Sequence, residues 1–289
     1  MKKLLILIIV LCVTGMTLDA QHKFGIRAGL NFTTFSGELE LNEVYDNTTG
    51  FHFGVNYTYQ MNTTIGLRAE LLYTQRGTQQ GIIDEAIPNI IKTTFCDRFV
   101  EVGNTDYKLD ATLNYFSIPL TAHVRVTEKI ELFGGISLDM LFSQTAGGTV
   151  RFQSRDRPED IYYELRFDHN YRTDLAGQPV SGNEITSQII NGVPTNVFTI
   201  IGGNYYFTAD EVEQRGNRFN FFDTNAIVGF NYFINSGFYL GLRLELGLLD
   251  LTNDSRDVSL REINSDTSFV FRSDTDRSQN LSLSFGFRF

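Results

Sequence analysis

Hydrophobic and polar residues alternate with a period of two along much of this chain. In the clearest segment, Leu281, Leu283, Phe285, Phe287 and Phe289 alternate with polar residues or Gly. Successive side chains of a β-strand point to opposite faces, so this pattern predicts strands with one apolar and one polar face. Eight such segments occur, at 24–32, 51–60, 65–74, 116–126, 130–142, 222–234, 238–248 and 280–289.

The composition of the polar faces distinguishes two all-β architectures. In a soluble sandwich the polar face meets water, which gives no reason for many glycines there. In a small transmembrane barrel the apolar face meets lipid, and Gly and paired charges fill a crowded interior. Eight strands leave room for side chains rather than an open channel, so we predict a structural network, with a polar path for protons or small solutes as the alternative. The predicted lumen charges are Arg27, Arg68, Glu70, Arg125, Glu131, Asp139, Asp223, Arg243, Glu245 and Arg288.

The lengths of the connections support a barrel. Short connections at 61–63, 127–129 and 235–237 alternate with long ones at about 35–49, 77–107, 144–215 and 250–279. Short periplasmic turns alternating with long external loops are typical of bacterial outer-membrane barrels. The sequence therefore predicts one all-β domain over 21–289. We expect an eight-stranded antiparallel up-and-down transmembrane barrel with both termini in the periplasm.

Two features complicate this assignment. Residues 161–167 alternate and 196–203 are strand-like, so ten strands are an alternative. Ten strands would create one long periplasmic turn at 168–195, which favours an extracellular hairpin or a sheet extension instead. In the fourth segment the apolar positions change parity before Tyr115, at Leu109, Ala111 and Leu113. This change predicts a β-bulge near Tyr115–Phe116.

The first 20 residues predict export. Lys2 and Lys3 precede an apolar run at 4–13 that is too short to span a bilayer, and a small-residue site ends at Ala20, as in a secretory signal peptide. No later apolar run approaches the roughly 18 residues of a membrane helix. The net charge of −10 argues against a nucleic-acid partner. After processing, Cys96 would be the one remaining cysteine, either a free thiol or an intermolecular link.

Three short motifs carry a family resemblance. They are Phe-Gly-Ile-Arg-Ala-Gly-Leu-Asn at 24–31, the segment 115–120 with its Ile-Pro-Leu, and the Gly-Phe-Arg-Phe that ends at Phe289. On these motifs the chain resembles the PorT-like outer-membrane β-barrel family of Bacteroidota envelopes, over nearly all of its length after the signal. The resemblance implies a barrel in the outer membrane. A founding member is tied to protein secretion, so an accessory role in a secretion or export complex is an alternative function. The long connection at 144–215 departs from the family pattern.

Catalytic and metal-binding patterns are weak. His52 and His123 fall on inward positions that suit packing or hydrogen bonding, and His169 beside Asp168 lacks a spacing that would pair it with a nucleophile. A lipid or peptide hydrolase is therefore a minor alternative, and we predict no catalytic residues, no cofactor and no metal. The last connection lacks the spacing and Gly of a calcium loop, and we expect its aspartates to face solvent. They are Asp254, Asp257, Asp266, Asp274 and Asp276.

Two further sets of residues suggest partners. The alternating phenylalanines of the last segment, Phe285, Phe287 and Phe289, predict a signal for the barrel-assembly machinery. Aromatic residues in the long connection offer contact area, either for a partner or for packing over the barrel mouth. They are Tyr162, Tyr163, Tyr205, Tyr206 and Phe207. The sequence thus favours a non-enzymatic barrel, surrounded by outer-membrane lipid, whose loops bind an envelope or extracellular protein or a glycan.

Overall fold

The computed structural model describes residues 21–39, 43–91, 99–159, 162–170, 185–190, 193–198, 200–201, 219–253, 258–263 and 269–289. The predicted signal peptide, Cys96 and the aromatic residues at 205–207 lie outside these residues. Asp254, Asp257 and Asp266 do too, and the side chains of Tyr163 and His169 are likewise not described. Among the described residues there is no helix with the length and apolar character needed to cross a membrane.

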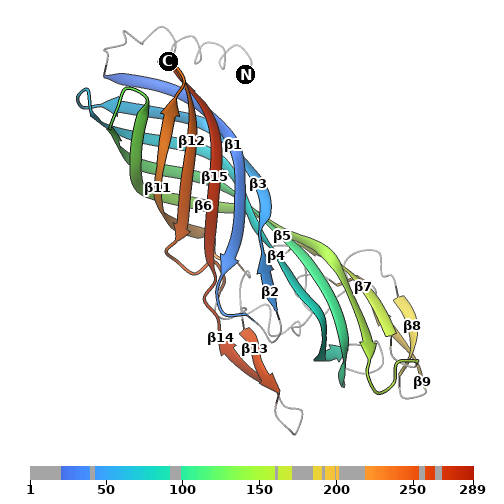
Figure 1. Cartoon of the computed structure of the whole chain (residues 1–289). Helices are drawn as coiled ribbons and strands as arrows, with labels where there is room; N and C mark the ends of the chain where they lie inside the picture. Colours follow the sequence, from blue (N-terminus) through green and yellow to red (C-terminus); the bar gives the residue numbers. More distant parts are fainter. Residues whose placement is uncertain are drawn as a thin grey trace, which may run out of the picture.

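Eight antiparallel strands close into a ring (Figure 1). In ring order they are β1 (His22–Ser36), β3 (Thr48–Gln60), β4 (Ile65–Ile91), β5 (Phe99–Arg125), β6 (Ile130–Ser154), β11 (Phe222–Phe233), β12 (Phe238–Gly247) and β15 (Arg277–Arg288). The pairing of β15 with β1, which aligns Leu283 with Leu30, closes the ring. The eight strands predicted from the sequence are confirmed, and the ten-stranded alternative is wrong.

Each ring strand has an apolar outer face and a polar inner face. On β15, Leu281, Leu283 and Phe285 are exposed, whereas Ser282 and Ser284 between them are buried. The same alternation holds in the other seven strands and defines an apolar band around the barrel. Nine to eleven tilted residues are enough for a strand to cross a bilayer, and each strand contributes about that many to the band. The band has the height expected of a lipid-facing surface.

Three short connections and the last residue of the chain lie at one end of the barrel, which we call the turn end (Figure 1). They span 61–64, 126–129 and 234–237. The side chains of Asn62, Thr127 and Asn235 each accept two backbone N–H bonds within their own turn, at 2.8–3.2 Å. Asn and Thr stabilise tight turns by such bonds. At the same end, the N–H of Phe289 donates to the carbonyl oxygen of Phe24 at 2.9 Å.

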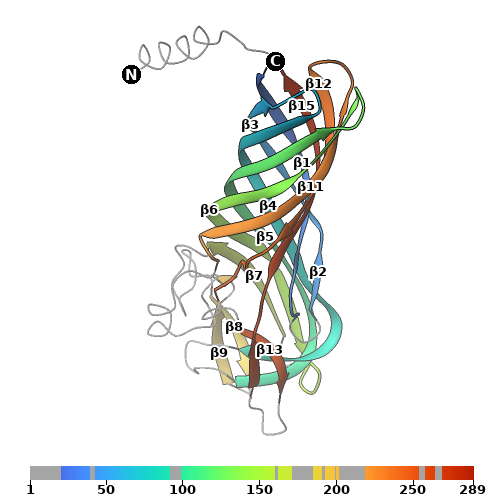
Figure 2. The same cartoon turned by 90° about the vertical axis from the view of Figure 1, so that its left-hand side faces the viewer.

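Three strands continue far beyond the apolar band. β4 and β5 each have 27 residues and β6 has 25, so at about 3.3 Å per residue the longest reach about 90 Å. β7 (Tyr162–Asn170) pairs with the outer part of β6, and β2 (Val44–Asp46) pairs with β4 (Figure 2). We call the outer parts of β4, β5 and β6 together with β7 the extension. The expected loop at 77–107 is thus largely wrong, because 77–91 and 99–107 are strand.

The segments that suggested ten strands lie outside the ring. β7 extends the sheet from the edge of β6, as the sheet-extension interpretation expected. β10 (Ile200–Ile201) pairs in parallel with β7, and β8 (Ile185–Ile190) forms a separate hairpin with β9 (Val193–Phe198). Another hairpin, of β13 (Val258–Ile263) and β14 (Phe269–Ser273), interrupts the last long connection. The expected loop at 144–215 is wrong at its start, since 144–154 continue β6.

The polarity of the sheet inverts where the barrel becomes the extension. On β5, alternate residues point inward throughout, but the buried ones change from Ser117 and Thr121 to Leu109 and Leu113. On the outer face, Lys108 and its neighbours at 106 and 110 are polar and exposed. An apolar inner face and a polar outer face are what a sheet needs in water. The inversion therefore marks the boundary between the lipid-facing and water-facing parts.

The predicted bulge is present, but on the neighbouring strand. The register between β5 and β6 shifts at Asn114–Tyr115, where Phe142 of β6 is the extra residue. β5 itself keeps its parity through Tyr115. The change of parity predicted for β5 is therefore wrong. The apolar positions shift because the inner lining becomes apolar, while β5 itself continues without an extra residue.

Candidate functional site: the charged lumen

Arg76 occupies the part of the lumen farthest from the turns. Its guanidinium donates to Asp139 and Glu245 at 2.8 Å each and approaches Asp223 at 3.5 Å. All four side chains are buried. Asn225 donates to both aspartates, at 2.7 and 2.9 Å. One arginine thus forms ion pairs with carboxylates from three different strands and ties β4 to β6, β11 and β12.

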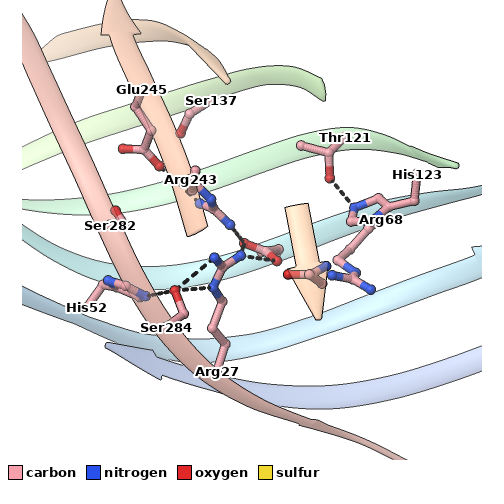
Figure 3. Close-up of polar contacts among 12 residues, drawn as sticks. Arg27, His52, Arg68, Thr121, His123, Ser137, Arg243, Glu245, Ser282 and Ser284 are labelled. Carbon is pink, nitrogen blue, oxygen red and sulfur yellow. Dashed lines mark hydrogen bonds and ion pairs between the residues drawn. The ribbon is translucent and has the colours of Figure 1, made fainter. Parts of the chain in front are cut away.

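Glu70 holds the middle of the lumen. It accepts bonds from Arg27 of β1 at 3.2 Å and from Arg243 of β12. Arg243 also donates to Glu245 at 3.0 Å, which connects this cluster to that of Arg76. Arg27 further donates to Ser284 of β15 at 2.8 and 3.0 Å (Figure 3). A continuous chain of ion pairs therefore runs across the barrel interior.

Glu131 collects the charges nearest the turn end. Arg68 donates to it at 3.1 Å, and the ring of His123 lies 2.8 Å from the same oxygen. Arg288 and the partly exposed Arg125 reach its other oxygen at 3.5 and 3.9 Å. Three arginines therefore share one carboxylate, so this end of the lumen is positively charged.

Aromatic rings and glycines complete the packing of the lumen. Arg68 stacks over Tyr239 at 5.7 Å and Arg76 over Tyr115 at 5.4 Å, distances at which cation–π attraction operates. A Cβ atom added at Gly286 would lie 2.2 Å from the ring of Tyr239. Gly at this inward position is therefore required by the side chain that crosses the lumen. The interior is filled with side chains.

The structure places the predicted lumen charges as follows. Nine of the ten are buried, and Arg125 is half-buried. All ten belong to the three clusters described above, of which those of Arg76 and Glu70 are joined through Arg243 and Glu245. Arg76 was not predicted, although it forms three ion pairs, more than any other arginine among the described residues. The parity of the third segment, continued by two residues beyond Thr74, would have found it.

Two buried histidines lie between a hydroxyl and a second polar group. His123 contacts Thr121 at 2.8 Å, and His52 contacts Ser284 at 3.0 Å (Figure 3). The second contacts are with Glu131 and Asn31, at 2.8 Å each. The order of groups resembles that of a hydrolase triad. Both hydroxyls, however, are buried in the packed lumen, and Arg27 already donates to that of Ser284. The contacts match the hydrogen-bonding role predicted for these histidines.

The prediction for the acidic residues of the last connection is wrong for two of them. Asp274 and Asp276 were expected to face solvent, but both are buried. Asp274 accepts bonds from the backbone N–H groups of Glu38 and Thr275, at 2.9 and 2.7 Å. The burial of Asp274 follows from this role in holding the loop backbone. Within the described part of the chain, no cluster of three or more His, Cys, Asp or Glu could hold a metal ion.

The predicted contact aromatics are only partly within the described residues. Tyr162, at the start of β7, is exposed. In the last strand, Phe285 and Phe289 are exposed, and the rings of Phe285 and Phe287 pack against Phe238 at 5.4 and 4.6 Å. These phenylalanines therefore belong to the apolar band near the turn end.

A closed ring of eight antiparallel strands, apolar outside and ion-paired within, defines the class of transmembrane β-barrels. The chain belongs to the outer membrane protein beta-barrel domain family, whose model matches residues 20–253.

Similar solved structures are also outer-membrane proteins. Ail, the attachment invasion locus protein of Yersinia pestis, is 12% identical, with 93% of this chain and 99% of that chain covered and a TM-score of 0.37. Neisserial surface protein A is 11% identical, with 92% and 97% covered and a TM-score of 0.36. OprG from Pseudomonas aeruginosa is 11% identical, with 92% and 95% covered and a TM-score of 0.34. Similarity at this level transfers no activity or partner. No match was found among curated protein sequences.

Proposed function

We propose that this chain is a non-enzymatic outer-membrane protein whose extension is a binding platform on the cell surface. The observation that carries the proposal is the length of β4, β5 and β6, which continue far past the apolar band. A barrel that only sealed its own lumen would need no such strands. The packed lumen supports the same conclusion, because it leaves the surface as the place for interaction.

The outer face of the extension is suited to contact with a hydrophilic partner. It presents Lys108 on β5, Tyr162 on β7, and an exposed ion pair between Arg151 and Glu164 at 3.2 Å. An aromatic side chain among charges of both signs provides contact area together with directed hydrogen bonds. An envelope protein or a glycan is the class of partner that this surface fits.

The platform requires the extension to face outward. In this proposal the turn end lies in the periplasm, because short turns are periplasmic in bacterial barrels. Both ends of the ring, at His22 and Phe289, then lie on the periplasmic side. Single cysteines in a Cys96→Ser background test this orientation. A membrane-impermeant maleimide should label Thr149→Cys in intact cells and Asn62→Cys only after lysis, and the reverse pattern would refute the proposal.

The platform itself is tested with cells that display the full chain. Binding of purified envelope glycans and of host-cell surfaces is compared between the wild type and a Tyr162→Ala/Arg151→Ala variant. We expect the variant to lose most of the retention at unchanged surface level. The matched control is Leu248→Ala, in the apolar band, which should retain the ligand. Equal retention by wild-type cells and by cells without the protein, for every surface tested, would contradict the proposal.

Experiments can distinguish two alternative functions from the surface platform. The PorT-like resemblance supports an accessory part of a secretion or export complex, and crosslinking from Asn62→Cys should then recover export components from the periplasmic side. A lipid or peptide hydrolase would use Thr121 and His123, the pair closest to the required geometry. Hydrolysis that is abolished in Thr121→Val would favour that alternative over the platform.

A further inference from the structure

A cavity of about 330 Å³ opens at the turn end of the barrel. Its charged lining comes from four separate places in the chain. Lys23 is the second residue of β1, Arg125 ends β5, Glu128 and Lys129 lie in the following turn, and Arg288 ends β15. Small-molecule sites start at volumes of about 300 Å³, so this cavity is large enough for a compact ligand or a lipid headgroup.

The lining has an excess of positive charge. Four of its five charged side chains are basic, and the carboxylate beneath them, Glu131, is already shared with Arg68. Arg125 and Arg288 reach Glu131 only at 3.9 and 3.5 Å. Among the described residues, Lys23 and Lys129 form no ion pair. These two lysines therefore line the cavity together with two arginines whose ion pairs with Glu131 are long.

One aromatic ring holds both arginines in place. The guanidinium of Arg288 lies 4.5 Å from the ring centre of Phe233, and that of Arg125 lies 5.6 Å from it. Phe233 itself is buried and lines the cavity. Stacking on a fixed ring reduces the side-chain freedom that binding would otherwise remove. The planar donors of arginine, with the compact charge of lysine, are the usual partners of phosphate oxygens.

The cavity also borders the apolar exterior. Ile234 lines it and is exposed, and Val126 in the neighbouring turn is exposed as well. These residues belong to the rim of the band that faces lipid. A phosphate at this level can therefore arrive either on a phospholipid headgroup or as a free anion from the aqueous side.

We propose that this cavity is a binding site for a phosphate-bearing anion, held by Lys23, Arg125, Lys129 and Arg288. The site lies at the opposite end of the molecule from the extension, so it does not depend on the surface-platform function. Because the cavity is open to solvent, salt screens the attraction of its charges for an anion, and the affinity should fall as ionic strength rises.

The test uses the full chain folded in a neutral detergent. Calorimetric titration with sodium pyrophosphate probes the soluble source. Native mass spectrometry after mixing with phosphatidylglycerol or phosphatidylcholine probes the lipid source. Lys23→Gln/Lys129→Gln removes one half-buried and one exposed charge, and neither lysine has an ion-pair partner among the described residues. Arg277→Gln, exposed at the start of β15 and far from the turn end, is the control for loss of a surface cation.

We expect wild-type protein to bind pyrophosphate, phosphatidylglycerol or both, in preference to phosphatidylcholine. The double variant should weaken that binding about tenfold, because two of the four attracting charges are lost, while Arg277→Gln stays at the wild-type value. Retention of the lipid without binding of pyrophosphate would identify the headgroup as the source, and the opposite result would identify a soluble anion. The proposal is overturned if wild-type protein binds neither probe, or if the double variant binds as well as the wild type.

Discussion

Replacing Arg76 by Met tests whether the lumen network holds the barrel together. Methionine keeps much of the length of the side chain and removes the charge that Asp139, Glu245 and Asp223 share. Removing one partner of a buried ion pair costs about 3–5 kcal/mol, because the charge left behind is no longer compensated. The full chain should therefore become markedly less stable while keeping its fold.

Other contacts around the three carboxylates limit the loss. Asp139 still accepts a bond from Asn225 at 2.7 Å, and Glu245 still accepts one from Arg243 at 3.0 Å. These remaining donors place the expected loss for Arg76→Met near the lower end of the range, at about 3 kcal/mol.

The assay is equilibrium urea unfolding in phospholipid vesicles. The chain contains no Trp, so circular dichroism and gel mobility without heating replace the usual fluorescence signal. Arg151→Met is the matched control, because it breaks an exposed pair with Glu164 and should change the free energy of unfolding very little. Adding Asp139→Asn to Arg76→Met should recover part of the loss, since a neutral amide needs no counter-ion. A free energy of unfolding for Arg76→Met within about 1 kcal/mol of the wild type would refute the reasoning.

Three further predictions concern the wall and the interior. Leu283→Arg puts a charge at the middle of the apolar band and should cost about 2–4 kcal/mol in the same urea assay, whereas Thr149→Arg on the extension should cost almost nothing. Gly286→Ala should destabilise the barrel through its clash with Tyr239, and Tyr239→Leu in the same chain should relieve much of that effect; failure of the relief would exclude a steric cause. In planar bilayers the packed lumen should give little or no conductance, and a large stable current would show that the interior is open.

The ring could be predicted from the sequence because its signal is local. Alternation along Leu281–Phe289, or along Phe51–Tyr59, fixes which face of a strand is apolar without knowledge of its neighbours. Short turns such as Asn62–Thr64 carry their own stabilising side chain. These signals together gave eight strands and the direction in which each side chain points.

The extension could not be predicted in the same way, because its polarity is inverted. In the barrel an outward apolar residue marks a strand, but Lys108 and Asp110 face outward in the extension while Leu109 faces inward. A search for strands that have apolar residues at the outward positions therefore misses these strands and assigns them to loops. The boundary between the two environments becomes visible only once the register of β5 and β6 is known.

The partners within the lumen also depend on register. Which charges are inward follows from parity, but Arg76 meets Glu245 only because the closed ring brings β4 opposite β12, 169 residues away in sequence. The same holds for the cavity at the turn end, whose lysines and arginines come from distant segments. Inward direction is a local property, whereas contact across a barrel is a global one.

In this structure the outer face of the ring meets lipid, and the outer face of the extension meets water. Spin labels placed singly on Val55, Leu283, Lys108 and Thr149, in a Cys96→Ser background and in vesicles, test it directly. Labels at Val55 and Leu283 should collide more with oxygen than with a water-soluble nickel chelate, and labels at Lys108 and Thr149 should show the reverse. Greater access of the nickel chelate to Val55 and Leu283 would contradict the account.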